Sequence, residues 1–134
     1  MQMEIRHESE HVIRVNGDDH SSIIVHRTKY DDPHGEDREV WGYSITRPLG
    51  ERGSVTERNA DIYTGVGKRA TPREMLGTLL SFLGAAAESY DYQVRTDEPG
   101  ENLDLFTPPV VEWAYQNSDE LSMLAYEIEG DDDE

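Results

Sequence analysis

The stretch TPREMLGTLLSFLGAAAESY, residues 71–90, marks the point where the chain changes from an alternating to a helical pattern. Thr71 and Glu74 flank a proline at the first helical position and together give the sequence signature of a capping box. Apolar residues then recur at helical spacing on one face: Leu76, Leu79, Leu80, Leu83, Ala86, Ala87 and Tyr90. The pattern predicts a helix from residue 72 to about 90. Since Gly77 and Gly84 each cost about 1 kcal/mol within a helix, we expect another element to approach closely there.

Before this helix, the first 65 residues show the pattern of strands and turns. Apolar and polar residues alternate in four runs, whose apolar members are Met1, Met3 and Ile5; Ile13 and Val15; Ile23 and Val25; and Trp41, Tyr43 and Ile45. Turn-forming residues separate these runs at 16–19, 31–35 and 49–53. The pattern predicts an antiparallel meander of about four strands. Residues 54–65 fit either a short helix or a strand.

After the helix, residues 90–97 suit a final strand, and a second helical region runs from residue 107 to about 129. In one continuous helix the apolar residues would share one side: Val110, Trp113, Ala114, Leu121, Leu124 and Ile128. Asn117 and Glu120 form a second capping-box signature, so this region is either one helix or two.

These patterns predict an α+β fold, in which the N-terminal meander is followed by two C-terminal helices packed on it. The chain has 134 residues, which is enough for one domain and too few for two ordinary ones. We expect residues 1–129 to form this single domain. Gly130 is a helix-stop signal, and residues 130–134 are expected to form an acidic, disordered tail.

The charge is unevenly distributed. The chain carries 29 acids, 12 bases and no cysteine, for a net charge of −17. Residues 96–134 contribute 13 of the acids and no base. This charge disfavours nucleic acid as a direct ligand and an anionic membrane as a docking surface. The N-terminus lacks the apolar stretch of a secretory signal, and residues 75–87 are too short to cross a bilayer, so we expect a cytoplasmic protein.

The acidic C-terminal part is the candidate binding site. It contains the carboxylates Glu112, Asp119, Glu120, Glu127, Glu129, Asp131, Asp132, Asp133 and Glu134. Acids at a helix C-terminus oppose the macrodipole, so helix stability does not explain them. We expect a non-enzymatic interaction protein, without cofactor or catalytic residues, whose partner is a basic protein surface; mimicry of nucleic acid is one version. Trp113, Tyr115 and Tyr126 are either interface anchors or core residues. Alternatively, the chain is a structural or assembly protein whose acidity serves solubility only.

A third hypothesis rests on the histidines. His7 and His11 satisfy the HExxH pattern of zinc metallopeptidases, which places both histidines on one face of a helix. The run from residue 6 to residue 11 is polar throughout and resembles a hairpin tip instead. In a meander, His7 and His11 could approach Asp31, Asp32 and His34 at one end of the sheet. A metal-binding protein or a zinc hydrolase therefore remains an alternative.

Overall fold

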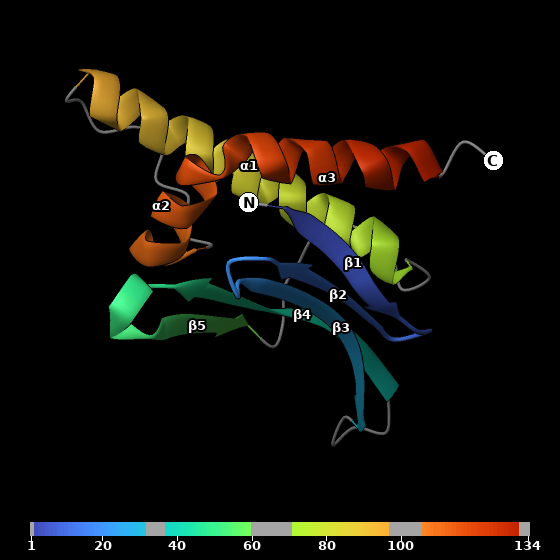
Figure 1. Ribbon diagram of the computed structural model, residues 1–134. Helices are drawn as coiled ribbons and strands as arrows, with labels where there is room; N and C mark the ends of the chain where they lie inside the picture. Colours follow the sequence, from blue (N-terminus) through green and yellow to red (C-terminus); the bar gives the residue numbers. More distant parts are fainter. Residues whose placement is uncertain (1, 32–36, 60–70, 97–105, 132–134) are drawn as a thin grey trace.

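The computed structural model describes residues 2–31, 37–59, 71–96 and 106–131 (Figure 1). The strands are β1 (Met3–Glu8), β2 (Val12–Gly17), β3 (Ser22–Asp31), β4 (Asp37–Pro48) and β5 (Ser54–Asn59). A 3-10 turn, η1 (Gly50–Arg52), joins the last two strands. The helices are α1 (Pro72–Thr96), α2 (Pro108–Gln116) and α3 (Ser118–Asp131). None of the described helices is long and apolar enough to span a membrane.

The five strands form one antiparallel sheet in the order β1-β2-β3-β4-β5. Figure 1 shows the three helices on one side of this sheet. The predicted α+β fold, a meander followed by packed helices, is therefore confirmed. The prediction missed one strand, because β5 occupies residues that fitted either a helix or a strand.

The core lies between the sheet and the helices. Residues that alternate along β2, β3 and β4 point to the same face because the side-chain period of a strand is two. The register brings Ile13 opposite Val25 and Val25 opposite Tyr43, and all three are buried. Apolar residues of α1, α2 and α3 complete the core, which the helical periodicity predicted.

Helix α1 begins as predicted but continues further. The backbone N–H of Glu74 donates to the Thr71 hydroxyl over 3.2 Å, so Thr71 is the N-cap. The predicted strand at residues 90–97 is wrong, because α1 runs to Thr96. An ion pair between Arg95 and Asp91, 2.8 Å long and one helical turn apart, supports this last part of the helix.

Close approach at the helical glycines is largely absent. A Cβ at Gly84 would have nothing within 4 Å, and one at Gly77 would lie 3.8 Å from Cγ2 of Ile128, an ordinary van der Waals contact. The sterically demanding glycine is Gly42 on β4, where a Cβ would lie 2.7 Å from the carbonyl oxygen of Asn59. The expectation of tight packing at Gly84 was therefore wrong.

The second helical region is two helices. Both the backbone N–H and the side-chain amide of Asn117 donate to the carbonyl of Trp113, over 3.1 and 2.9 Å. Asn117 thereby closes α2, and its own carbonyl accepts from Leu121 in α3. The apolar side predicted for this region is buried on both helices. Helix α3 ends at Asp131, slightly beyond the expected end, and residues 132–134 lie outside the described residues.

One carboxylate ties the sheet to the helical layer. Glu57 on β5 accepts hydrogen bonds from the Tyr43 hydroxyl (2.6 Å) and from the backbone N–H of Thr107 (2.7 Å), the N-cap of α2. Burial and the neighbouring Glu57 carboxylate both raise the pKa of Tyr43 above its ordinary value. The sheet and the start of α2 are therefore linked by a charge-assisted pair of bonds.

Candidate functional site

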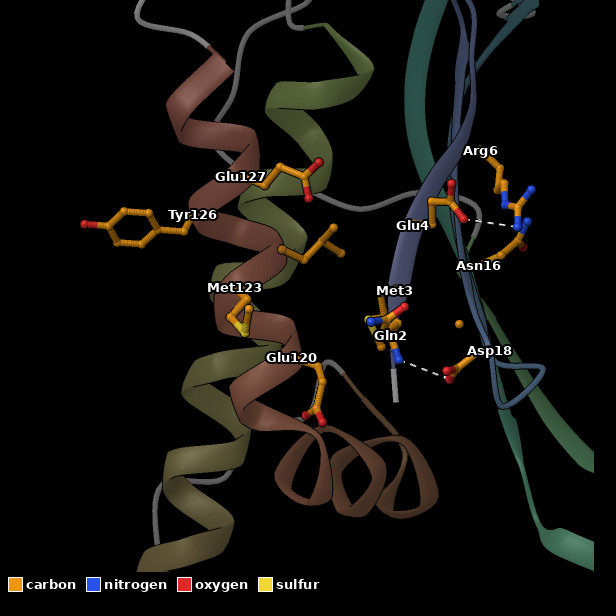
Figure 2. Close-up of a pocket in the computed structure, with 12 residues that line it drawn as sticks. Gln2, Met3, Glu4, Arg6, Asn16, Asp18, Glu120, Met123, Tyr126 and Glu127 are labelled. Carbon is orange, nitrogen blue, oxygen red and sulfur yellow. Dashed lines mark hydrogen bonds and ion pairs between the residues drawn. The ribbon is translucent and has the colours of Figure 1, made fainter.

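A groove with a volume of about 890 Å³ lies between the edge strand β1 and helix α3 (Figure 2). The lining residues come from β1 and the residue before it, from the end of β2 and the residue after it, and from α3: Gln2, Met3, Glu4, Arg6, Asn16, Gly17, Asp18, Glu120, Met123, Leu124, Tyr126 and Glu127. Met123 and Tyr126 are large hydrophobic residues with exposed fractions of 73% and 81%. The groove thus combines apolar surface with several charged groups.

The backbone of β1 presents one row of polar groups to this groove. The carbonyl of Gln2 accepts from Asp18 N–H over 3.0 Å, so the polar groups of Gln2 point toward β2. Backbone groups alternate in direction along a strand, so the N–H and C=O of Met3 and Ile5 point outward. Among the described residues, β1 has no strand on this outer side. Unpaired strand edges of this kind are templates for pairing with another chain.

The charged groups of the groove are mostly carboxylates. Glu4, Asp18, Glu120 and Glu127 line it, and the one base is Arg6, which pairs with Glu4 over 3.0 Å. Figure 2 shows Glu120 and Glu127 on the side of α3 that faces β1, while Tyr126 points away from β1. The groove therefore presents negative potential beside the open strand edge.

The carboxylates predicted as the binding site do not all lie on one surface. Glu112 lies on α2, where its Oε1 is 3.7 Å from Nη1 of the largely buried Arg47 and accepts from the Gln116 amide. The end of α2 at Asn117 separates Glu112 from the carboxylates of α3. Arg47 also donates to the carbonyl of Pro109 over 3.0 Å. Glu112 is thus part of a contact between β4 and α2.

The remaining acids of the predicted site lie on or after α3. Glu120 and Glu127 line the β1–α3 groove, and Asp119 is exposed in the first turn of the helix. Glu129 lines a second groove, of about 590 Å³, between α1 and α3. Asp131 is the last residue of α3, whereas Asp132, Asp133 and Glu134 lie outside the described residues.

Three exposed acids of α3 are not paired with the arginines of the sheet in the described part of the chain. Within the described part of the chain, no ion pair involves Asp119, Glu127 or Glu129. No base lies in the last turn of α3, so Glu129 stands unfavourably near the negative end of the helix macrodipole. Negative potential is consequently concentrated on this helix.

The aromatic candidates have different roles. Trp113 is buried in the core, and the half-buried Tyr115 packs against Tyr90 with ring centroids 5.0 Å apart. Tyr126 is the exposed one of the three and lines both grooves. Met123 is an additional residue of the groove that was not predicted, although an apolar residue outside the apolar face of a helix indicates an exposed contact surface.

The histidine motif lies on a hairpin. His7 belongs to β1, and the chain turns at Ser9, whose N–H donates to the carbonyl of Val12 over 2.7 Å. The helix required by the HExxH peptidase geometry is therefore not formed. The described residues contain no group of three metal-ligating side chains. The loop site suggested around Asp32 and His34 falls outside the described residues.

Comparison of the chain with protein-family models, with curated proteins and with solved structures found no match. The function of the chain is therefore inferred from the chemistry of the groove and of α3 themselves.

Proposed function

We propose that this chain is a small, non-enzymatic interaction protein that binds a basic surface of another macromolecule through the carboxylates of its C-terminal part. The acids of α3 that lack an ion-pair partner support the proposal best. Its acids Asp119, Glu127 and Glu129 have no ion-pair partner in the described part of the chain, and Glu129 opposes the helix dipole. Such residues are better explained by a charge on a partner than by the stability of the fold.

The distribution of bases supports the same proposal. Among the described helices, only α1 contains bases, Arg73 and Arg95, and Arg95 is paired with Asp91. Arg14 and Arg58 are exposed on the sheet. The adjacent residues Ile13 and Glu57 face the helices, so the two arginines point to the opposite face of the sheet. Helices α2 and α3 thus contain acids and no base, and a basic partner would be oriented by the acids of α3. Mimicry of nucleic acid toward a DNA-binding protein is one form of this activity.

The proposal differs testably from a role of the acids in solubility alone. If the charge serves solubility only, neutralising Glu127 and Glu129 leaves the affinity for any basic ligand unchanged. If the proposal is correct, the affinity falls and the solubility of the chain changes little, because its net charge remains strongly negative.

A direct test uses a synthetic octapeptide in which arginine and valine alternate. Its affinity for the full chain is measured by titration calorimetry in salt from 0.1 to 1 M. Over this range the Debye length falls from about 10 Å to about 3 Å, so we expect the Kd to rise at least about tenfold. A peptide with glutamine in place of arginine is the control and should bind weakly at every salt concentration. An affinity for the arginine peptide that is unchanged by salt would contradict the proposal.

A further inference from the structure

The groove between β1 and α3 suggests how a partner is held. We propose that an extended, basic segment of a partner protein enters this groove and pairs with β1 as an added strand. The inference rests on the proposed function and specifies its partner: a short basic segment with interspersed apolar residues. Strand addition of this kind obtains affinity from main-chain hydrogen bonds and specificity from the surroundings of the side chains.

The outer edge of β1 offers backbone groups for pairing. Met3 and Ile5 each direct an N–H and a C=O away from β2, into the space at the outer side of the sheet. The register between β1 and β2 shifts between Ile5 and His7, which marks a β-bulge. Bulges alter the local twist and interrupt regular pairing. The regular edge is therefore short and suits a segment of a few residues.

An added strand would meet a surface that carries both apolar and acidic side chains. On the side of the helices it would lie beside the exposed Met123 and beside Glu120 and Glu127 of α3. Asp18, which follows β2, lines the same groove and accepts a hydrogen bond from the Gln2 N–H over 3.1 Å. Arginine and lysine combine an apolar stem with a cationic head, so both features of this surface suit them. Intervening apolar side chains would cover Met123.

The charge of the groove distinguishes a basic partner from a second copy of this chain. Two copies paired through β1 would bring two acidic grooves together, each carrying Glu4, Asp18, Glu120 and Glu127. Each chain also has a net charge of −17. Like charges placed together oppose association, whereas a cationic segment is attracted. The charge therefore favours a basic partner.

The experiment compares the alternating arginine–valine octapeptide with a block peptide of the same composition, in which four arginines precede four valines. Amide hydrogen exchange of the full chain is followed by NMR with and without each peptide. We expect the alternating peptide to slow exchange at the outward amides of Met3 and Ile5 at least about tenfold. The inward amide of Glu4 is the internal control, since it already faces β2. The block peptide should bind more weakly.

A pair of surface variants tests the side-chain contacts. Met123→Ser replaces an exposed apolar side chain that lines the groove. Val94→Ser is the control, because it replaces an exposed apolar side chain on α1 that does not line the groove. We expect M123S to weaken binding of the alternating peptide roughly fivefold and V94S to leave it unchanged. Both residues are exposed, so neither variant should impair folding. Equal effects of M123S and V94S would contradict the groove as the binding site.

The outcomes separate this inference from the proposed function. If both peptides bind in a salt-dependent manner without slowed exchange at Met3 and Ile5, strand addition is overturned and the acidic surface remains the binding site. If neither peptide binds more tightly than the glutamine control, both proposals fail. If Met3 and Ile5 become protected with rising concentration of the chain alone, a second copy occupies the edge and the inference is wrong.

Discussion

Glu129→Gln should make the protein more stable. Glu129 lies in the last turn of α3, near the negative end of the helix macrodipole, and its carboxylate has no ion pair among the described residues. Removing such a charge is worth about 0.3–1 kcal/mol at low ionic strength. A change of 1 kcal/mol shifts the Tm of a domain of this size by roughly 4 °C, so we expect a rise in Tm of about 1–4 °C.

Asp119→Asn is the matched control on the same helix. Asp119 is in the first turn of α3, where a negative charge is favourable, so its neutralisation should lower the Tm by a similar amount. Both shifts are measured by calorimetry at low salt and again in 1 M salt, where screening should remove most of each. A lower Tm for E129Q, or shifts of the same sign for both variants, would refute the dipole argument. It would also weaken the claim that Glu129 is kept for binding.

Three further predictions concern the fold. Gly84→Ala should stabilise α1 by about 0.5–1 kcal/mol, because a Cβ there meets nothing within 4 Å. Gly42→Ala should strongly destabilise the protein, because its methyl group would lie 2.7 Å from the Asn59 carbonyl oxygen. Urea unfolding measures both changes in the free energy of unfolding, and equal changes would contradict the prediction. Glu57→Ala removes the acceptor for the Tyr43 hydroxyl and should lower the free energy of unfolding by about 2 kcal/mol or more in the same assay. The pKa of Tyr43 is raised in the folded state, so the stability that this tyrosine contributes is present below pH 10 and is lost as the pH rises above about 10, the pKa of an unfolded tyrosine. Tyr43→Phe should therefore reduce the loss of stability at alkaline pH. An unchanged loss in this variant would contradict the role of Tyr43.

Much of the fold was predictable because the spacing of apolar residues indicates which face of a strand or helix is buried. The alternation in β2, β3 and β4 and the helical spacing in α1 each identified one buried face. Strand β5 was harder, since SVTERN contains one apolar residue, Val55, and is largely exposed or half-buried. The last turns of α1 were read as a strand because Tyr92 and Val94 favour strands, although both are exposed there and the helix simply continues.

The acids of α3 could be predicted from the sequence, but the site that they form could not. The groove exists because β1 is an edge strand and α3 lies beside it, and both facts depend on tertiary arrangement. The pairing of Glu112 with Arg47 likewise joins residues far apart in the chain. Local patterns identify residue types and helix faces, whereas the partner of a given charge is decided by packing.

The comparison of two variants with equal net charge tests the central claim most directly. E127Q/E129Q neutralises two acids of α3, and E10Q/E51Q neutralises two exposed acids outside the helical layer. The Kd of the alternating arginine–valine peptide is measured for both and for the unmodified chain at 0.1 M salt. We predict that E127Q/E129Q weakens binding roughly tenfold and that E10Q/E51Q changes it less than about twofold. Equal losses in the two variants would show that net charge alone attracts the peptide, and would contradict a binding surface on α3.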